Sequence, residues 1–516
     1  MAGFVKDIVG RIKPREKPTA LTLSAHIPHA PEFPPFNAEI TELFRYRRQA
    51  GVNIGSLFVL EKWLCPPRLC SSALSTHWDS ELDFLTQCES LEHARQSLED
   101  HWDNFITNDD FKFLASTGIN SVRLPIGYWI AGREFLAPPF DRFAGIHDAA
   151  WNRFLNIIAM AAKHGIGVLV DLHAAPGAKV QFLKSANQSV TIKVLRKLAS
   201  TLAPINNVIG LEILNEPSDS ASLTNFYLKA IRAIRDAVPD IDLPIYIHDA
   251  WNMAKYSSII QPIQRQYGFV VLDTHQYFCH QLEDHKKSAE QHIAHVSSTV
   301  KESIERNGRL IRNNIIVGEW SVVLNSMSMP RGADEAQVMR EFGRVELDTW
   351  DAVCPGHFYW TYKTSDDNWY WSYIYCHRKG ILPGKFRNGS IPERIVQKIL
   401  ALVRTGPHRN QEHHQAQTSH IEYWTSRGQQ EVKRHIVQFD EGFKDGYEVA
   451  LRFLEEAASR VGFIEQLAIG YALRNQTIKT QKKEFAWQFN HGFMQGVAAI
   501  DKAILEEIGQ SSHSET

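Results

Sequence analysis

The sequence of 516 residues lacks the patterns that mark several common classes of protein. Its six cysteines form no CxxC pair, which argues against a zinc ribbon, and six in a chain of this length do not indicate a disulfide scaffold. No stretch approaches the roughly 20 apolar residues of a membrane span. The formal net charge is only -2, so no excess of one sign points to nucleic acid or to an acidic polymer as a partner.

The N-terminal segment, residues 1–40, begins without the unbroken apolar core of a signal peptide. We therefore expect a cytoplasmic protein with reduced thiols; an organelle or the membrane periphery is the alternative location. Phe4, Ile8 and Ile12 recur at helical spacing among basic residues. This pattern is typical of an amphipathic helix, which either touches an anionic membrane or docks on the rest of the protein.

Eight short apolar runs follow, each ending on polar or aromatic residues: 51–55, 121–127, 167–173, 208–216, 244–249, 269–275, 315–320 and 356–361. Amphipathic segments of helical length lie between them. Eight such alternations predict an α/β protein whose residues 41–405 form a closed (β/α)8 TIM barrel. The competing fold, an open doubly wound sheet, is disfavoured because the first run, Gly51–Ser56, lacks the third glycine of a dinucleotide-binding loop.

The chain beyond the barrel divides into two parts. Residues 406–434 are rich in His, Gln, Ser and Thr, which predicts a linker or surface loop. Residues 435–516 return to helical patterning, and Phe439–Tyr447 and Phe489–Val497 share the repeat Phe-x-x-Gly-Phe-x-x-Gly followed by an apolar residue. Glycines four apart let a second helix approach closely. We expect a helical C-terminal appendage whose repeated helices pack on each other, on the barrel, or on a second subunit in a homo-oligomer.

Two of the apolar runs end on glutamates. The run 208–216 closes on Asn215 and Glu216, and the run 315–320 carries Glu319. β/α barrels place their chemistry at the C-terminal ends of their strands. Cleavage of a glycosidic bond requires two carboxylates that face one sugar ring, one to protonate the leaving oxygen and the other to attack the ring or activate water. The pair therefore predicts a retaining β-glycosidase.

Five segments at strand ends carry a family resemblance: Gly51–Trp63, Gly118–Trp129, Asp171–Gly177, Leu214–Pro217 and Gly318–Ser321. Over residues 50–385 the chain resembles glycoside hydrolase family 5, and in particular its fungal exo-β-1,3-glucanase branch. The resemblance implies that Glu216 is the general acid/base and Glu319 the nucleophile, with their carboxyls about 5–5.5 Å apart. It also implies a raised pKa for Glu216, from the approach of Glu319 and from partial desolvation.

Further residues match the family's pocket for the terminal sugar: Glu61, Arg123, Asn215, Tyr277, Trp360 and the pocket histidines His173 and His275. The resemblance implies that Arg123 and Tyr277 hydrogen-bond the nucleophile and keep it ionised. It also implies that Asn215 binds the 2-hydroxyl of the sugar, that Glu61 binds its far hydroxyls, and that Trp360 lies beneath its ring.

The leaving-group side departs from the family pattern. Phe182 matches an aromatic ring that clamps the second sugar, but Leu183 and Lys184 replace polar residues. His280 stands where the other half of the clamp is expected to be aromatic, and the loop 322–334 also differs. The comparison implies an intact site for the terminal glucose beside an altered site for the leaving group.

Together, the residues and the resemblance predict an intracellular, exo-acting, retaining β-glucosidase, similar to a glucan 1,3-β-glucosidase, that removes one glucose from a glucan fragment or a β-glucoside. The leaving group stays open among glucan, glycolipid and phenolic compound. No cofactor and no metal ion is predicted, because no His-x-His or Lys-centred cluster follows a strand. The alternatives are a catalytically inactive barrel that serves as a carbohydrate-binding or assembly module, and a metal-dependent hydrolase on the same fold.

Overall fold

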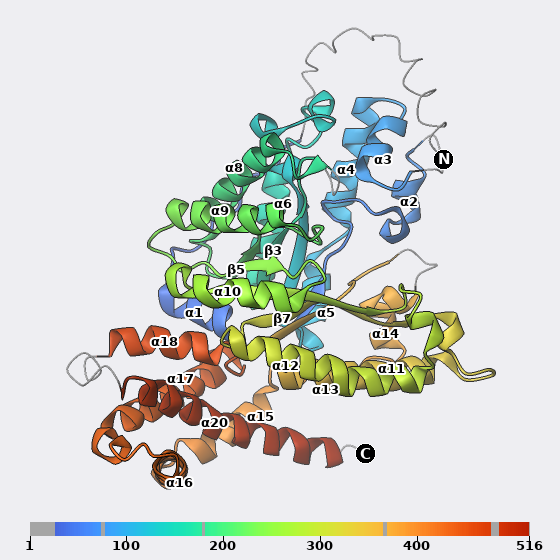
Figure 1. Ribbon diagram of the computed structural model, residues 1–516. Helices are drawn as coiled ribbons and strands as arrows, with labels where there is room; N and C mark the ends of the chain where they lie inside the picture. The colour runs from blue at the N-terminus through green and yellow to red at the C-terminus, as the bar shows by residue number, and fades with distance from the viewer. Residues whose placement is uncertain (1–25, 74–77, 178–180, 365–368, 476–484, 515–516) are drawn as a thin grey trace.

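The structure, a computed structural model, describes residues 26–73, 78–177, 181–364, 369–475 and 485–514 (Figure 1). The amphipathic helix predicted from Phe4, Ile8 and Ile12 lies outside the described residues. Among the helices that are described, none combines the length and the apolar character needed to span a bilayer.

Eight parallel strands close into a barrel in the order β1 to β8, and β8 pairs with β1. The strands are β1 Gln49–Asn53, β2 Ser121–Gly127, β3 Gly167–Ala174, β4 Val208–Glu212, β5 Ile245–His248, β6 Val270–Phe278, β7 Ile315–Leu324 and β8 Gly356–Tyr359. Each overlaps one of the eight predicted runs, so the predicted (β/α)8 barrel is confirmed. The runs form such strands because they are apolar on both faces, with helices covering the outside and side chains filling the inside.

Amphipathic helices surround the barrel: α1 Ala38–Tyr46, α2 Pro67–Cys70, α3 Glu81–Gln87, α4 Leu91–Asn104, α5 Asn108–Ser116, α6 Ala150–Lys163, α8 Ser185–Leu202, α9 Ala221–Ala237, α10 Met253–Tyr267, α11 Ala289–His295, α12 Lys301–Leu310, α13 Glu335–Val353 and α14 Tyr373–Arg378. Helices α2 to α4 form an insertion between β1 and α5, which Figure 1 shows as a blue group at the top. The segment that leads from β1 into the insertion lies along β2, because Phe58 pairs with Ile126 in an isolated parallel bridge.

The inside of the barrel changes character from one end to the other. Around the first half of the strands it holds an apolar cluster that includes Leu169, Tyr246 and Phe358. Phe463, from the C-terminal part of the chain, belongs to this cluster, and its ring lies 5.0 Å from that of Phe269. Towards the C-terminal ends of the strands the interior becomes charged, and the candidate site lies there.

The segment 406–434 is not the predicted linker or loop, because most of it forms the helix α16 Gly406–Ser426. Pro407 lies in the first turn of this helix, where a backbone N–H would have no partner within the helix, so proline costs no hydrogen bond there. The prediction was wrong because this helix fully buries only His420, so its polar composition resembles that of a loop. The helix α15 Glu393–Val403 contributes its buried residues to the C-terminal apolar cluster, and the barrel boundary at residue 405 remains a prediction.

The repeated Phe-x-x-Gly pattern forms the seam between two long helices, α17 Val437–Ala457 and α20 Trp487–Ser514. A Cβ added to any of the repeat glycines would lie within 2.1–2.2 Å of a carbonyl oxygen of the opposite helix: Gly442, Gly446, Gly492 and Gly496. The close helix approach predicted from these glycines is therefore confirmed, and the repeated helices pack on each other. A homo-oligomer remains a prediction.

Replacing Gly442 by alanine should loosen this seam, because the new Cβ would lie 2.1 Å from the carbonyl oxygen of Phe489. We expect the free energy of unfolding to fall by about 1–3 kcal/mol, the usual cost of overpacking. Gly470→Ala, in α18 Ile464–Arg474, is the matched control, since no described atom lies within 4 Å of its Cβ and alanine favours the helix. Denaturant unfolding measures both variants, and equal stability would contradict the close-packed seam.

Candidate active site

The two candidate glutamates lie at the same place, at the C-terminal ends of β4 and β7. Glu216 follows β4 with a backbone φ of 38°, a left-handed conformation that is uncommon for a glutamate, and Glu319 lies within β7. His275, on β6, connects them: its Nδ1 lies 2.9 Å from Oε1 of Glu216 and 3.3 Å from Oε2 of Glu319. The sequence-based pairing of these two carboxyl groups is therefore correct in space.

Arg123, on β2, is fully buried and forms ion pairs with carboxylates from four other strands. Its Nη1 donates to Oε1 of Glu319 at 2.8 Å, and its Nε donates to Oε2 of Glu212 at 2.8 Å. Its Nη2 lies 3.0 Å from Oδ2 of Asp171 and donates to Oδ1 of Asn215 at 2.9 Å. One guanidinium thus orients both Glu319 and the residue beside Glu216.

The sequence analysis missed Asp171, Glu212 and Asp273 as members of the site. Each is completely buried and follows at least two apolar residues of its strand. A single carboxylate in such a run needs a buried partner, so these positions could have been recognised as ligands of a cation such as Arg123. Burial raises the pKa of Glu212 well above its usual range, and the nearby Asp171 adds to that rise.

The protonation of the other groups follows from the same crowding. Burial raises the pKa of Glu319, while the charges of His275 and Arg123 act in the opposite direction. Although burial opposes it, the charge of Glu319 helps raise the pKa of His275 well above its usual value. Tyr277 donates its hydroxyl proton to Oε2 of Glu319 at 2.8 Å, so the predicted contacts of Arg123 and Tyr277 with this glutamate are present.

The glutamates open into a cavity of about 380 Å³, which we call the polar cavity. It is lined by Glu61, Trp63, His173, Asn215, Glu216, Tyr277, His280, Glu319, Trp360 and Trp371. Trp360 stacks on His173 with ring centroids 5.8 Å apart, and Glu61 accepts a 3.0 Å hydrogen bond from Nε1 of Trp63. All predicted pocket residues except Phe182 therefore line or support one cavity, and the sequence analysis missed Trp63 and Trp371.

Phe182 lies instead in an adjoining cavity of about 570 Å³, which we call the apolar cavity. The two cavities share His173, Asn215 and Glu216. His280 stacks on Trp371 in the polar cavity, with ring centroids 5.8 Å apart. Phe182 and His280 thus line the two adjoining cavities, and the clamp expected from them remains a prediction.

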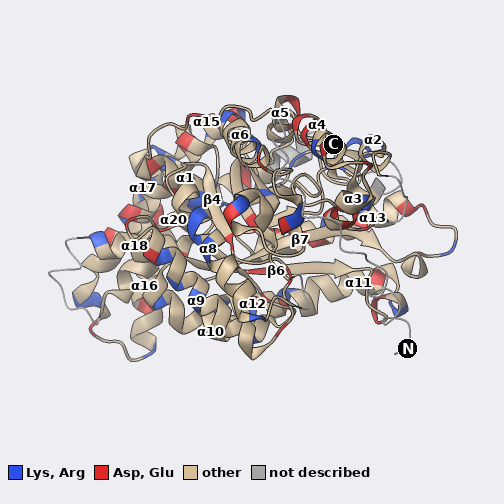
Figure 2. Cartoon of the chain, turned by 90° about the horizontal axis from the view of Figure 1, so that it is seen from above, with Lys and Arg blue, Asp and Glu red and all other residues tan. Residues whose placement is uncertain are grey.

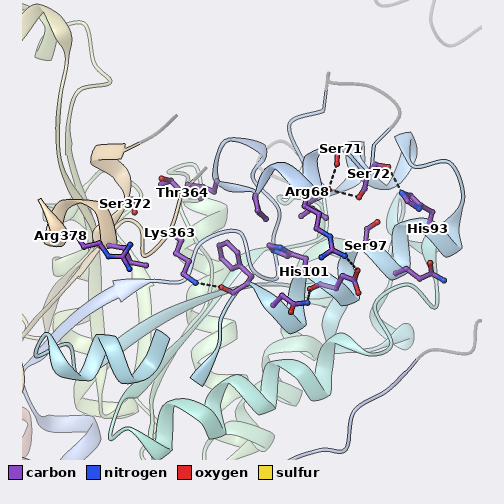
Figure 3. A pocket seen from close by; sticks show the side chains of 18 residues that line it. Arg68, Ser71, Ser72, His93, Ser97, His101, Lys363, Thr364, Ser372 and Arg378 are labelled. Carbon is purple, nitrogen blue, oxygen red and sulfur yellow. Dashed lines mark hydrogen bonds and ion pairs between the residues drawn. The ribbon is translucent and has the colours of Figure 1, made fainter. Parts of the chain in front are cut away.

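A third cavity, of about 860 Å³, lies between the insertion and the segment that follows β8 (Figure 3). Hydroxyl, amide and basic side chains line it, including His93, Lys363 and Arg378. Among the described residues that line it, Asp100 is the one carboxylate, and it lies 3.0 Å from Arg68 in an ion pair. The described pair of candidate carboxylates, Glu216 and Glu319, lines the polar cavity instead.

Two groups of side chains near the glutamates have the composition of a metal site, namely Glu216 with His248 and His275, and Glu212 with Asp273 and His275. Within each group the ligand atoms lie within 4.8 Å of one another. His275 already contacts Glu216 and Glu319 through Nδ1, so a metal ion would compete with those contacts. The absence of a metal requirement remains a prediction.

Figure 2 shows acidic and basic residues interspersed over the described chain.

A β/α barrel that brings two carboxylates to one cavity at its strand ends has the architecture of a glycoside hydrolase. The family model described as Cellulase (glycosyl hydrolase family 5) matches residues 86–366, more than half of the chain. The chain belongs to glycosyl hydrolase family 5 and is a glycoside hydrolase. A second family model, described as the Glucan 1,3-beta-glucosidase 3 C-terminal domain, matches residues 406–504.

Several curated relatives come from fungi. Glucan 1,3-beta-glucosidase 3 of Schizosaccharomyces pombe is 27% identical over 483 residues, covering 87% of this chain and 94% of the relative. An uncharacterized glycosyl hydrolase of Saccharomyces cerevisiae is 25% identical, and the alignment covers 97% of this chain and 100% of that relative. Among solved structures, rutinosidase from Aspergillus niger superposes with a TM-score of 0.54 at 18% identity over 66% of this chain and 98% of that one, a likeness of fold alone.

Replacing Arg123 by methionine should leave buried carboxylates without their cation, and we expect a loss of about 3–5 kcal/mol in unfolding free energy at pH 7. Their folded-state pKa values would then exceed the unfolded ones, so the destabilisation grows as the pH rises and shrinks as it falls. The stability deficit should therefore be smaller at pH 5 than at pH 7. Arg68→Met, at an exposed ion pair, is the control and should change little. A deficit that does not depend on pH would contradict this account.

Proposed function

We propose that this glycoside hydrolase is an exo-acting β-glucosidase that works with retention and removes a terminal β-linked glucose from a glucan fragment or a β-glucoside. Glu216 acts as the acid/base and Glu319 as the nucleophile. The relatives named glucan 1,3-beta-glucosidase support this choice of sugar and linkage. A cytoplasmic location and contact of the N-terminal segment with a membrane are further proposals.

The observation that carries the proposal is the short path between the two carboxylates through His275. Oε1 of Glu216 and Oε2 of Glu319 can be no further apart than the combined length of these contacts, 2.9 Å and 3.3 Å. This upper limit, which holds for that one pair of oxygens, is below the roughly 6.5 Å at which the carboxyl separations of inverting enzymes begin. A pair this close supports direct attack by a carboxylate over attack by an interposed water molecule.

The reaction then proceeds in two steps. In the first, Glu319 attacks the anomeric carbon while Glu216 gives its proton to the glycosidic oxygen, and the leaving alcohol departs. In the second, Glu216 takes a proton from water, whose oxygen attacks the same carbon and releases β-glucose and the carboxylate of Glu319. Arg123 donates a hydrogen bond to one oxygen of Glu319 and Tyr277 donates to the other. These two bonds would fix the direction of attack.

Exo-action is supported by the small volume of the polar cavity, about 380 Å³. Glu61, Trp63 and Trp371 line it, and the rings of the two tryptophans lie 5.6 Å apart. In the proposed pose the far hydroxyls of the terminal sugar meet Glu61. Asn215, which accepts a hydrogen bond from Arg123 and lies next to His173, would bind the 2-hydroxyl.

Removing either glutamate tests the assignment of roles. We expect Glu216→Ala and Glu319→Ala each to lower kcat on a nitrophenyl β-glucoside by on the order of 10²–10⁴-fold. Added azide should restore turnover, giving β-glucosyl azide with Glu216→Ala and α-glucosyl azide with Glu319→Ala, because azide replaces the water in one case and the nucleophile in the other.

Glu283→Gln, an exposed residue paired with Lys286, is the control and should retain activity. For the unaltered enzyme, nuclear magnetic resonance can follow the anomer of glucose that is released. Retention predicts that β-glucose appears before α-glucose. Binding of a glucose analogue without turnover, unaffected by Glu319→Gln, would instead support the inactive carbohydrate-binding module.

Tyr277→Phe removes one hydrogen bond to Glu319 and should lower kcat/KM about 10- to 100-fold, since a bond to a charged group contributes roughly 1.5–3 kcal/mol. Tyr423→Phe, on the exposed surface of α16, is the matched control. Steady-state kinetics, with thermal unfolding to show that both variants are folded, make the measurement. Unchanged kinetics for Tyr277→Phe would show that this contact does not contribute to the reaction.

A further inference from the structure

A further cavity, of about 470 Å³, lies at the end of the barrel opposite the two glutamates, and we call it the seam cavity. Pro355, just ahead of β8, and Asn313, just ahead of β7, line it from the barrel. Glu465, in α18, and Met494, in α20, line it from the C-terminal helices, which Figure 1 shows below the barrel. The cavity therefore lies on the boundary between two parts of the chain, where small-molecule sites of roughly 300–1,000 Å³ are common.

One arginine of the seam cavity is largely buried without a carboxylate beside it. Arg48, just ahead of β1, donates from Nη1 to the carbonyl oxygens of Asp351 and Cys354 and to Oδ1 of Asn388, at 3.0–3.4 Å. Its Nε is buried and has no hydrogen-bond partner, and none of the described carboxylates forms an ion pair with this arginine. A desolvated guanidinium with an unused N–H is costly unless an anion lies beside it.

Two more arginines line the seam cavity from the end of α12. Arg312 donates from Nη1 to Oε1 of Gln466 at 2.9 Å, and it too has no ion pair within the described part of the chain. Its backbone φ of 60° is left-handed, an uncommon conformation for arginine. Arg309 is 73% exposed and lies 3.3 Å from Glu305. Two arginines without a carboxylate partner therefore share this cavity.

The carboxylates of the seam cavity do not balance its positive charges. The described lining contains two, Glu305 and Glu465, against three arginines. Glu465 accepts a 2.5 Å hydrogen bond from Nδ2 of Asn313, and burial raises its pKa. Burial lowers the pKa of Arg48 to about 10, and the charge of Arg460 adds to the fall. An anion in the cavity would stabilise the charged form of Arg48.

From this arrangement we infer that the seam cavity binds a phosphate group, as inorganic phosphate or as part of a small phosphate ester, through Arg48 and Arg312. A phosphate ester carries about −1.5 to −2 charges at pH 7, which matches two arginines that lack an ion pair. Guanidinium groups bind phosphate oxygens through paired N–H donors. Val353, Ile464 and Met494 give the cavity an apolar wall, which leaves room for the organic part of an ester. The bound phosphate contacts both the barrel and the C-terminal helices and stabilises their docking.

Thermal unfolding of the full chain with inorganic phosphate or with glycerol 3-phosphate tests the inference, with potassium chloride at equal ionic strength as the reference. We expect either phosphate compound to raise the unfolding temperature in a saturable way, as a ligand of the folded state does. Calorimetric titration then gives the two dissociation constants. Tighter binding of glycerol 3-phosphate would identify an ester as the ligand, and equal or weaker binding would identify free phosphate.

Variants locate the binding and separate it from the general effect of phosphate on protein stability. Arg312→Gln should weaken phosphate binding about tenfold or more, because a hydrogen bond to a charged group is lost. Arg309→Gln, at an exposed position where folding is not at risk, should weaken it several-fold. Arg344→Gln, in an exposed ion pair with Asp348 and outside the cavity lining, is the matched control and should bind as the unaltered protein does. Absence of saturable stabilisation by both phosphate compounds, or equal binding by all three variants, would overturn the inference.

Discussion

The site depends on one buried cation. The guanidinium of Arg123 lies inside the barrel and contacts carboxylates from β3, β4 and β7, while Asp273 on β6 lies 3.8 Å from its Nε. A single carboxylate buried there would be costly, and so would a single arginine. Together they form a network in which each group limits the movement of the others. Because Glu319 belongs to that network and Asn215 is bonded to it, the interior of the barrel fixes the positions of these two residues.

Around this fixed centre, the structure offers two unlike environments that meet at Glu216. On one side, polar and aromatic groups surround the polar cavity, and on the other, mostly apolar groups surround the larger apolar cavity. β3 and the segment after β4 contribute to both cavities through His173, Asn215 and Glu216. The insertion and the segment after β2 contribute to the apolar cavity, at a distance in sequence from the carboxylates around Arg123.

Much of this could be predicted from the sequence. The strands were found because a barrel strand covered on both faces is apolar throughout, and Glu216 and Glu319 because each stands at the end of such a run. The boundaries of the C-terminal part were harder. α16 exposes most of its surface, so its composition resembled that of a loop, and α15 packs with helices that follow it in sequence. Trp63 and Trp371 could not be placed, because nothing local marks a tryptophan that faces a cavity.

Phe463, which lies about a hundred residues after β8, completes the apolar cluster inside the barrel. Its ring fills the lower mouth of the barrel, beside Phe269, and the next residue upstream, Gly462, donates its N–H to the carbonyl oxygen of Tyr46, just ahead of β1. During synthesis all eight strands leave the ribosome well before residue 463 does. Until residue 463 has been synthesised, the apolar cluster around Phe269 lacks the ring of Phe463. A chain that ends after β8 would leave this part of the cluster exposed to water.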